Sequence, residues 1–400
     1  MFVSFFQSER SLSTLSLVIP KMVTKAGMLI VIALMLGACS DDDVLPPSPL
    51  PDFDEEIQVE ELWSVDVDDG VDDHYLLLTP AITERWAYAA SYDGEVVKLN
   101  REDGEEVWEI ETEHKITGGV GAGYGVVVYG TDNGEAVALS EENGSEIWKV
   151  ELSGQILATP AVGASRVVVQ TMDGRMHALN RETGKKEWLY DTPIPNLTLR
   201  GSSSPIIVGE VTLAGFANGR LVAVKTENGG VGWEYPVSEP QGRSELERLV
   251  DLDGRFWVAR NVVYAATYQG KLAAIDIPSG RLLWQKPFST YAGVSEKLDR
   301  VYVVDQDSVI KVLDAVSGAE VWTTDLFKGR RLSAITPVGV NAVVGDFEGY
   351  LHWLHYRDGR IQARVRVDRD GLRAPPIVKD NVVYVQGNSG ELAAYKVIEK

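Results

Sequence analysis

Hydrophobic residues along most of this chain form short runs separated by turn-forming residues, and almost no stretch has the periodicity of a helix. Typical runs are "RVVVQT" from Arg166 and "NVVYAAT" from Asn261. Other stretches alternate hydrophobic and polar positions, as around Met176 and Ala178, which suits half-buried β-strands. The pattern therefore predicts an all-β protein of many short antiparallel strands.

These runs belong to a unit that recurs along the chain. "GEVVKLNREDGEEVW" from Gly94 and "GEAVALSEENGSEIW" from Gly134 are two of seven complete copies. The others start at Gly174, Gly219, Gly270, Ser308 and Gly349, and an eighth, incomplete copy starts at Gly390. In each complete copy a glycine stands ten residues after the first position, and a tryptophan follows four residues later except at Ala363. Internal repetition of this kind indicates a repeat architecture.

Each unit predicts four strands. Pairs such as Asp93–Gly94 and Asn133–Gly134 are typical of tight hairpin turns, where glycine adopts positive φ without strain. The second glycine marks another turn, the tryptophan lies in the strand after it, and a further hydrophobic run precedes the unit. Four-stranded units of about 40 residues are the blades of a β-propeller. We therefore predict an eight-bladed propeller over residues 59–400.

The two ends of the repeat array complement each other. The last copy lacks its fourth strand. Near the N-terminus, "VEELWSVDV" around Trp63 resembles a fourth strand, but the first three strands of a unit do not precede it. Joining them would close the ring and remove an exposed edge. The glycine-and-tryptophan signature resembles the quinoprotein-dehydrogenase-type repeat, and the resemblance implies that the tryptophans pack between neighbouring blades. These are Trp63, Trp108, Trp148, Trp188, Trp233, Trp284 and Trp322.

The N-terminus has the features of a bacterial secretion signal. Lys21 and Lys25 precede an apolar stretch that ends "LGAC" at Cys39, the only cysteine in the chain. This sequence resembles a lipobox, so residues 1–38 would be a signal peptide, with Met22 as an alternative start, and Cys39 would be lipidated. The resemblance further implies the periplasmic face of the outer membrane, because no aspartate directly follows the cysteine. The acidic, proline-rich residues 39–58 predict a tether.

Two adjacent intervals between the repeats are unusually long. Successive copies start 40, 40, 45, 51, 38, 41 and 41 residues apart. Both excesses fall after the tryptophan strand, in connections that emerge on one face of a propeller, and such insertions commonly form binding surfaces. They contain "PNLTLRGSSSP" from Pro195 and "SEPQGRSELERLVDLDG" from Ser238.

Together with the lipobox and the repeat number, these insertions and "GDFEGYLHWL" from Gly345 resemble the BamB family. Its members are propeller lipoproteins of the outer-membrane β-barrel assembly (BAM) machine. The resemblance implies a non-catalytic scaffold that contacts a periplasmic domain of the barrel protein BamA, with unfolded outer-membrane proteins as further partners. Carried over, the contact residues are Leu197, Leu199, Arg200, Asp251 and Asp253. An internal pairing of Arg200 with Asp251 or Asp253 remains an alternative.

Charge and composition limit the other functions. The net charge of −21 argues against nucleic-acid binding. One alternative function is a quinone- or calcium-dependent periplasmic oxidoreductase, since such enzymes share the repeat. Another is a lipoprotein that binds polysaccharide or peptide at the ring face through aromatics such as Trp257 or Tyr291, although nothing in their spacing distinguishes them. The chain has no second cysteine for the vicinal disulfide of that family, and no calcium-loop spacing surrounds Asp251 and Asp253. His352 and His355 are three residues apart, which on a strand places them on opposite faces and disfavours a shared metal. We therefore expect no catalytic residue, cofactor or metal.

Overall fold

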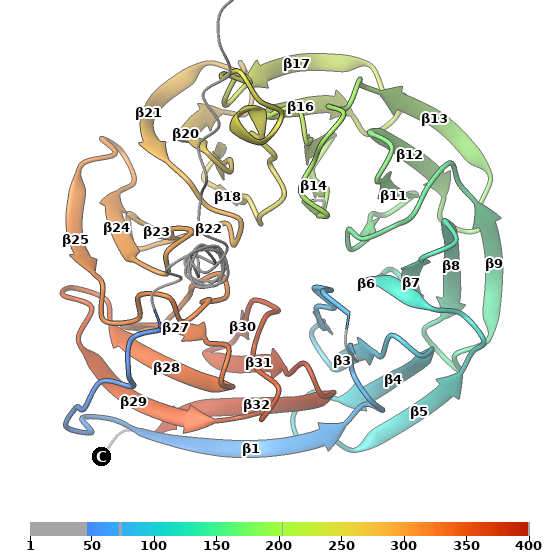
Figure 1. The fold of residues 1–400 in the computed structure, drawn as a ribbon. Coiled ribbons are helices and arrows are strands. Elements are labelled where there is room, and N and C mark those ends of the chain that lie inside the picture. Colours follow the sequence, from blue (N-terminus) through green and yellow to red (C-terminus); the bar gives the residue numbers. More distant parts are fainter. Residues whose placement is uncertain (1–45, 72–73, 202, 399–400) are drawn as a thin grey trace, which may run out of the picture. The chain divides into compact units, whose positions relative to one another are not determined.

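The computed structural model describes residues 46–71, 74–201 and 203–398. The predicted signal peptide and Cys39 lie outside these residues. Residues Pro47–Lys400 form one compact unit, in which eight four-stranded antiparallel sheets are arranged as the blades of a ring (Figure 1). The predicted eight-bladed β-propeller is thus confirmed. No helix in the described ranges is long and apolar enough to cross a membrane.

Each blade has an inner, a second, a third and an outer strand. The inner strands are β2 (Ala81–Ile82), β6 (Ile116–Gly123), β10 (Ala161–Val162), β14 (Ile206–Val208), β18 (Trp257–Ala259), β22 (Val294–Lys297), β26 (Thr336–Val338) and β30 (Ile377–Lys379). The second strands are β3 (Trp86–Ala90), β7 (Val126–Thr131), β11 (Arg166–Thr171), β15 (Val211–Gly215), β19 (Val262–Ala266), β23 (Arg300–Val304), β27 (Asn341–Gly345) and β31 (Val382–Gln386).

The remaining strands complete the blades. The third strands are β4 (Glu95–Asn100), β8 (Glu135–Ser140), β12 (Arg175–Asn180), β16 (Arg220–Lys225), β20 (Gly270–Asp276), β24 (Ile310–Asp314), β28 (Tyr350–His355) and β32 (Glu391–Ile398). The outer strands are β5 (Glu106–Glu111), β9 (Glu146–Glu151), β13 (Lys186–Asp191), β17 (Val231–Pro236), β21 (Leu282–Phe288), β25 (Glu320–Thr324), β29 (Ile361–Arg366) and β1 (Gln58–Asp66). One short 3₁₀ helix, η1 (Leu246–Arg248), lies between β17 and β18.

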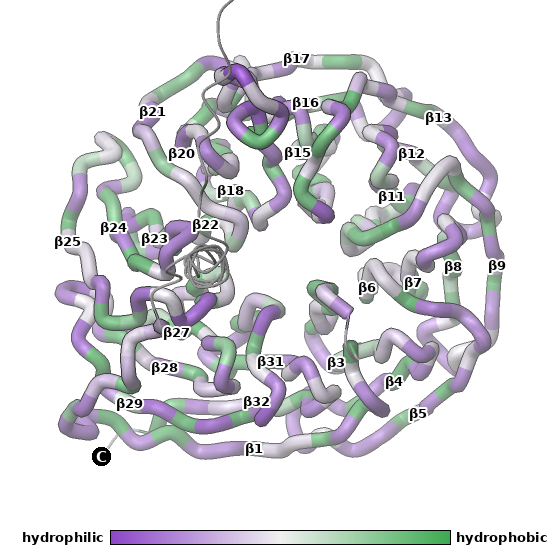
Figure 2. Tube along the Cα trace, in the orientation of Figure 1, coloured by the Kyte–Doolittle hydropathy of each residue, from purple (hydrophilic) through white to green (hydrophobic). Residues whose placement is uncertain are grey.

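The second and third strands are buried on both faces, which differs from the predicted half-buried alternation. In β12, for example, Met176, His177, Ala178 and Leu179 are all buried, because each blade is covered by a neighbour on either side. Alternation occurs instead in outer strands such as β5 and β9, where Trp108 and Trp148 are the buried positions. Figure 2 shows hydrophobic residues recurring in the middle strands of the blades.

The tryptophan of each outer strand lies against a turn of the next blade. Its ring stands so close to the second glycine of that blade that a Cβ there would collide with it, as at Gly184, where the Cβ would lie 2.8 Å from Trp148 Cδ2. The indole N–H also donates to a backbone carbonyl of that turn, as from Trp148 to Arg181 (2.7 Å). The same donation is made by Trp63, Trp108, Trp188, Trp233, Trp284 and Trp322.

The ring closes through both ends of the described chain. Strand β1 pairs antiparallel with β32, and Trp63 lies opposite Ala394 in this register. Blade eight therefore consists of β30, β31 and β32 with β1 as the outer strand. Ala363 replaces the tryptophan at the junction of blades seven and eight, where blade eight has no glycine turn to receive an indole. Trp353, fully buried, packs there against Tyr395 with the ring centroids 6.2 Å apart.

The second half of the predicted tether belongs to the propeller unit. Residues 47–57, which we call the strap, lie along blades six and seven. The Ser48 N–H donates to the Lys328 carbonyl (2.9 Å), and the Glu56 N–H donates to that of Gln362 (3.0 Å). Phe53 is half-buried against the core between these blades. The compact unit accordingly starts at Pro47 rather than at residue 59.

Candidate functional site

The two long interblade connections lie next to each other. The first loop, residues 192–205, joins blade three to blade four, and the second loop, residues 237–256, joins blade four to blade five and contains η1. Between them the Asp251 carboxylate accepts a hydrogen bond of 2.7 Å from the Leu199 backbone N–H. A Cβ on Gly201 would lie 2.9 Å from Asp253 Oδ2, so the two loops are packed closely here. The expected side-by-side arrangement is present.

The first loop presents its predicted contact residues at the surface. Leu197 is 39% exposed, Leu199 is half-buried and Arg200 is exposed. The Arg200 guanidinium donates through Nη2 to Gln155 Oε1 (3.3 Å), and not to either aspartate. The alternative of an internal ion pair with Asp251 or Asp253 is therefore not what the structure shows. Leucines beside an available guanidinium form a surface with an apolar anchor and a directional polar group.

The two aspartates of the second loop face inward. Asp251 is 1% exposed, and burial raises its pKa to about 6 although the Leu199 N–H stabilises the charged form. Burial, together with the neighbouring Asp251 carboxylate, holds the pKa of Asp253 well above its ordinary value. Neither Asp251 Oδ1 nor Asp253 Oδ2 has a hydrogen-bond partner in the described part of the chain. In this structure the aspartates hold the first loop in position and do not form an exposed acidic surface.

Gln155 had no distinguishing signal in the sequence. It lies in the connection from blade two to blade three, and it meets Arg200 only because the ring brings neighbouring connections together. A pairing that depends on the curvature of the ring cannot be read from local sequence.

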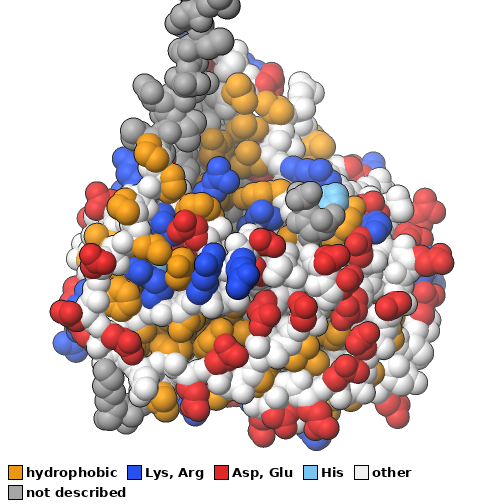
Figure 3. Space-filling view, turned by 60° about the horizontal axis from the view of Figure 1, so that its bottom comes forward, with side chains coloured by type: hydrophobic (Ala, Val, Ile, Leu, Met, Phe, Trp, Pro, Cys, Tyr) orange, Lys and Arg blue, Asp and Glu red, His pale blue; other side chains and the backbone are white. Residues whose placement is uncertain are grey.

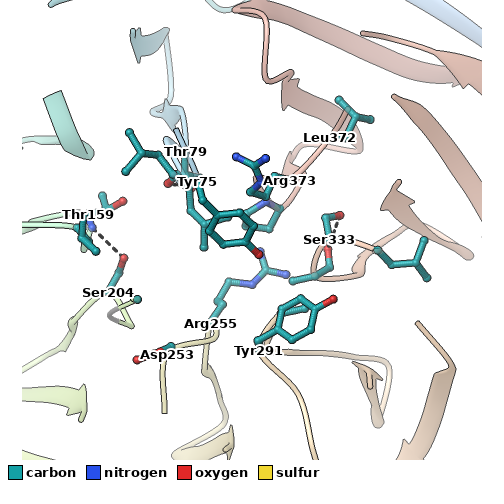
Figure 4. A pocket seen from close by; sticks show the side chains of 18 of the residues that line it. Tyr75, Thr79, Thr159, Ser204, Asp253, Arg255, Tyr291, Ser333, Leu372 and Arg373 are labelled. Carbon is teal, nitrogen blue, oxygen red and sulfur yellow. Dashed lines mark hydrogen bonds between the residues drawn. The ribbon is translucent and has the colours of Figure 1, made fainter. Parts of the chain in front are cut away.

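The central cavity adjoins the first loop. It has a volume of about 1270 Å³, and Leu199, Arg200 and Gly201 form part of its lining. Tyr75, Arg255, Tyr291 and Arg373 also line the cavity, and Figure 4 shows them entering it from other connections between blades. The two loops therefore stand beside the mouth of a cavity that the whole ring surrounds.

The two histidines considered above as possible metal ligands, His352 and His355, each contact a carboxylate instead. His352 Nε2 is 2.9 Å from a carboxylate oxygen of Asp346, and both side chains are fully buried. His355 Nδ1 is 3.0 Å from Asp358, at the surface. Among the residues that the structure describes, no group of three or more His, Cys, Asp or Glu side chains is placed to hold a metal ion.

Fold and loops together define a class: an eight-bladed propeller of quinoprotein-type repeats, with a paired loop surface on one face. A family model described as "Outer membrane protein assembly factor BamB" matches residues 92–310 and 306–398. The BamB of Pseudomonas aeruginosa is 52% identical over 375 residues, which are 93% of this chain and 99% of that protein. The BamB of Escherichia coli is 35% identical over 370 residues, 89% of this chain and 94% of that protein. The chain belongs to the BamB family.

Solved structures agree with this assignment. The crystal structure of BamB from Moraxella catarrhalis superposes with a TM-score of 0.78 at 28% identity and covers 85% of this chain and 100% of that chain. A quinohemoprotein alcohol dehydrogenase from Pseudomonas putida gives a TM-score of 0.67 at 15% identity, over 84% of this chain and 76% of that chain. The likeness to the dehydrogenase shows a shared fold alone.

Proposed function

We propose that the chain is an assembly factor of the outer-membrane β-barrel assembly machinery, acting as a non-catalytic scaffold that binds a periplasmic domain of BamA. The family membership along nearly the whole chain is the observation that supports this function. Holding BamA would assist the folding and insertion of barrel proteins into the outer membrane. The scaffold would be held at the periplasmic face of that membrane by a lipid on Cys39.

The binding surface would be the first loop, with Leu197 and Leu199 as apolar anchors and Arg200 as the polar contact. Asp251 and Asp253 would not contact BamA directly. They would hold the first loop in its binding conformation, as the hydrogen bond from the Leu199 N–H to Asp251 indicates. Hot spots of protein interfaces commonly combine a buried apolar side chain with a neighbouring charged group that orients the partner.

The test is calorimetric titration of the chain without its signal peptide against the periplasmic domains of BamA. We expect the wild type to bind and Arg200→Glu to weaken binding at least tenfold, because the substitution reverses a charge at the centre of the surface. Arg369→Glu is the matched control: Arg369 is also an exposed arginine on an interblade connection, but on the one from blade seven to blade eight.

Each outcome bears on the proposal. Equal losses in the two variants would mean that net charge and not the first loop governs binding. No binding by a correctly folded wild type would overturn the BamA contact. The alternative, an oxidoreductase, predicts a bound quinone or calcium; the absorption spectrum and metal content of the purified protein test it directly.

A further inference from the structure

The central cavity has an unusual charge for this protein. Four arginines line it, and each comes from a different interblade connection: Arg200, Arg255, Arg331 and Arg373. The chain as a whole has a net charge of −21, and Figure 3 shows acidic side chains spread over the outer side of the ring. Cations gathered around one hollow of an acidic protein are available for a ligand when no carboxylate of the protein neutralises them.

None of these four arginines forms an ion pair with a described residue. Arg255 Nη2 donates to Thr336 Oγ1 (2.9 Å) and to the Ile335 carbonyl (3.3 Å), and its Nε has no partner in the described ranges. Arg373 Nη1 donates to the His74 carbonyl (2.9 Å). By contrast, Arg330, outside the cavity, holds two carboxylates.

Burial makes the unpaired charges costly. Desolvation lowers the pKa of Arg255 to about 10 and also lowers that of Arg373. A guanidinium removed from water without a counter-ion is destabilising, and an anion that enters beside it recovers that energy. Three carboxylates line the cavity as well: Asp307 and Asp370 are exposed, and Asp253 is half-buried with a raised pKa that favours its neutral form.

The lining between the arginines is largely aromatic. Tyr75 is 61% exposed, and the Arg373 guanidinium lies 4.3 Å above its ring. Tyr291 and Trp257 also line the cavity, and the Arg255 guanidinium lies 5.1 Å from the Trp257 ring. In Figure 4 Tyr75, Arg255, Tyr291 and Arg373 extend into the cavity from different connections. Such a lining would accept apolar side chains between charged groups.

The size of the cavity distinguishes between ligands. Its volume of about 1270 Å³ exceeds the roughly 300–1,000 Å³ of typical small-molecule sites. The arginines are also distributed around the ring, where several carboxylates along one chain can reach them together. We infer that the central cavity binds an extended acidic peptide segment, with its carboxylates on Arg255 and Arg373 and its apolar side chains on Tyr75, Tyr291 and Trp257.

The probe for the experiment is a dye-labelled peptide, Glu-Phe-Glu-Leu-Glu-amide, and its matched neutral form, Gln-Phe-Gln-Leu-Gln-amide, in fluorescence anisotropy titrations. We expect the acidic peptide to bind at least tenfold more tightly than the neutral one, and the difference to shrink as salt rises. Arg373→Gln should weaken binding of the acidic peptide at least tenfold. Arg369→Gln is the control, since Arg369 lies on the same connection but does not line the cavity.

Arg331→Gln is a second variant at an exposed lining position, and it keeps the test valid if Arg373→Gln fails to fold. Equal binding of the two peptides, or equal effects of the cavity variant and its control, would overturn the inference. Free phenylacetate that binds as tightly as the acidic peptide would instead assign the cavity to small carboxylates. BamA binding is tested with Arg200→Glu and peptide binding with Arg373→Gln, so either proposal can fail without the other.

Discussion

The Asp251 carboxylate accepts a hydrogen bond of 2.7 Å from the backbone N–H of Leu199, 52 residues earlier in the chain. This contact joins the two loops on either side of blade four, and it fixes the position of Leu199 and, with it, of the exposed Arg200 that follows. The bond has a cost, because Asp251 is 1% exposed and its second oxygen has no partner among the described residues. A buried carboxylate retained at such a cost suggests that the position of the first loop matters for function.

Asp251→Asn and Asp251→Leu separate a positioning role from direct contact with BamA. Asparagine keeps an oxygen that can accept the Leu199 N–H, whereas leucine has the same number of side-chain heavy atoms, branched in the same way, and no acceptor. We expect the asparagine variant to bind BamA within about threefold of the wild type and the leucine variant to lose tenfold or more in calorimetric titration. If the charge of Asp251 met the partner directly, both variants would lose binding equally.

The raised pKa of Asp251 predicts a pH-dependent contribution to stability. Its pKa is about 6 in the folded chain, against about 3.9 in an unfolded one, so the folded state binds this proton more tightly. This group therefore adds to the free energy of unfolding as the pH falls from about 7 to about 4, by up to about 3 kcal/mol. The side chain in Asp251→Asn does not titrate, so the free energy of unfolding of that variant lacks this increase at low pH.

Denaturant unfolding at pH 7.5 and pH 4.5 measures the effect. The stability of the wild type relative to Asp251→Asn should increase at the lower pH. Asp69→Asn, at an exposed aspartate, serves as the control and should show no comparable change with pH. A difference between wild type and Asp251→Asn that is the same at both pH values would show that Asp251 stays ionised in the folded protein.

The contact between tryptophan and glycine gives a stability prediction with a matched control. Gly184 has φ +69°, and a Cβ there would lie 2.8 Å from the Trp148 ring; Gly209 has φ +58° and open space around it. Alanine at either position strains the backbone by about 1 kcal/mol, but only Gly184→Ala also displaces the indole. We expect losses of about 3 kcal/mol for Gly184→Ala and about 1 kcal/mol for Gly209→Ala in chemical denaturation. Equal losses would mean that backbone strain alone sets the requirement for glycine.

Much of the fold could be predicted because every blade repeats the same local signals. The turn glycines, the hydrophobic runs and the tryptophan each fix one strand, and the orphan strand around Trp63 revealed how the ring closes. The burial of β12 on both faces was not predicted, because alternation in one strand does not report what covers its other face. Whether the second face of a strand is buried depends on how neighbouring blades pack against it, and this tertiary packing is not encoded in the pattern of a single strand.

The candidate site was predictable only in outline. Unequal repeat spacing located the two loops, yet it did not indicate that Asp251 points inward to Leu199 or that Arg200 contacts Gln155. The acidic, proline-rich composition of residues 47–57 likewise predicted a tether, whereas arginines far along the chain hold this segment on the propeller. Arg364 Nη2 donates to the Pro51 carbonyl (2.7 Å), and Arg330 Nη1 donates to that of Ser48 (3.0 Å). The composition of a segment predicts whether the segment folds by itself. It does not predict whether residues far along the chain will bind that segment in an ordered conformation.

The strap gives the last prediction. Phe53 is half-buried against blades six and seven, and the Arg364 guanidinium lies 4.9 Å from its ring. Phe53→Ala removes that apolar contact and should release the strap, because the hydrogen bonds at either end then have little packing between them. Hydrogen exchange in a peptide covering residues 47–57 should become at least tenfold faster, while the buried strands keep their protection. Asp54→Ala, at the exposed neighbouring position, should leave the exchange unchanged. Similar rates in the two variants would show that the backbone hydrogen bonds of Ser48 and Glu56, and the ion pair of Glu56 with Arg360, are enough to hold the strap on the propeller.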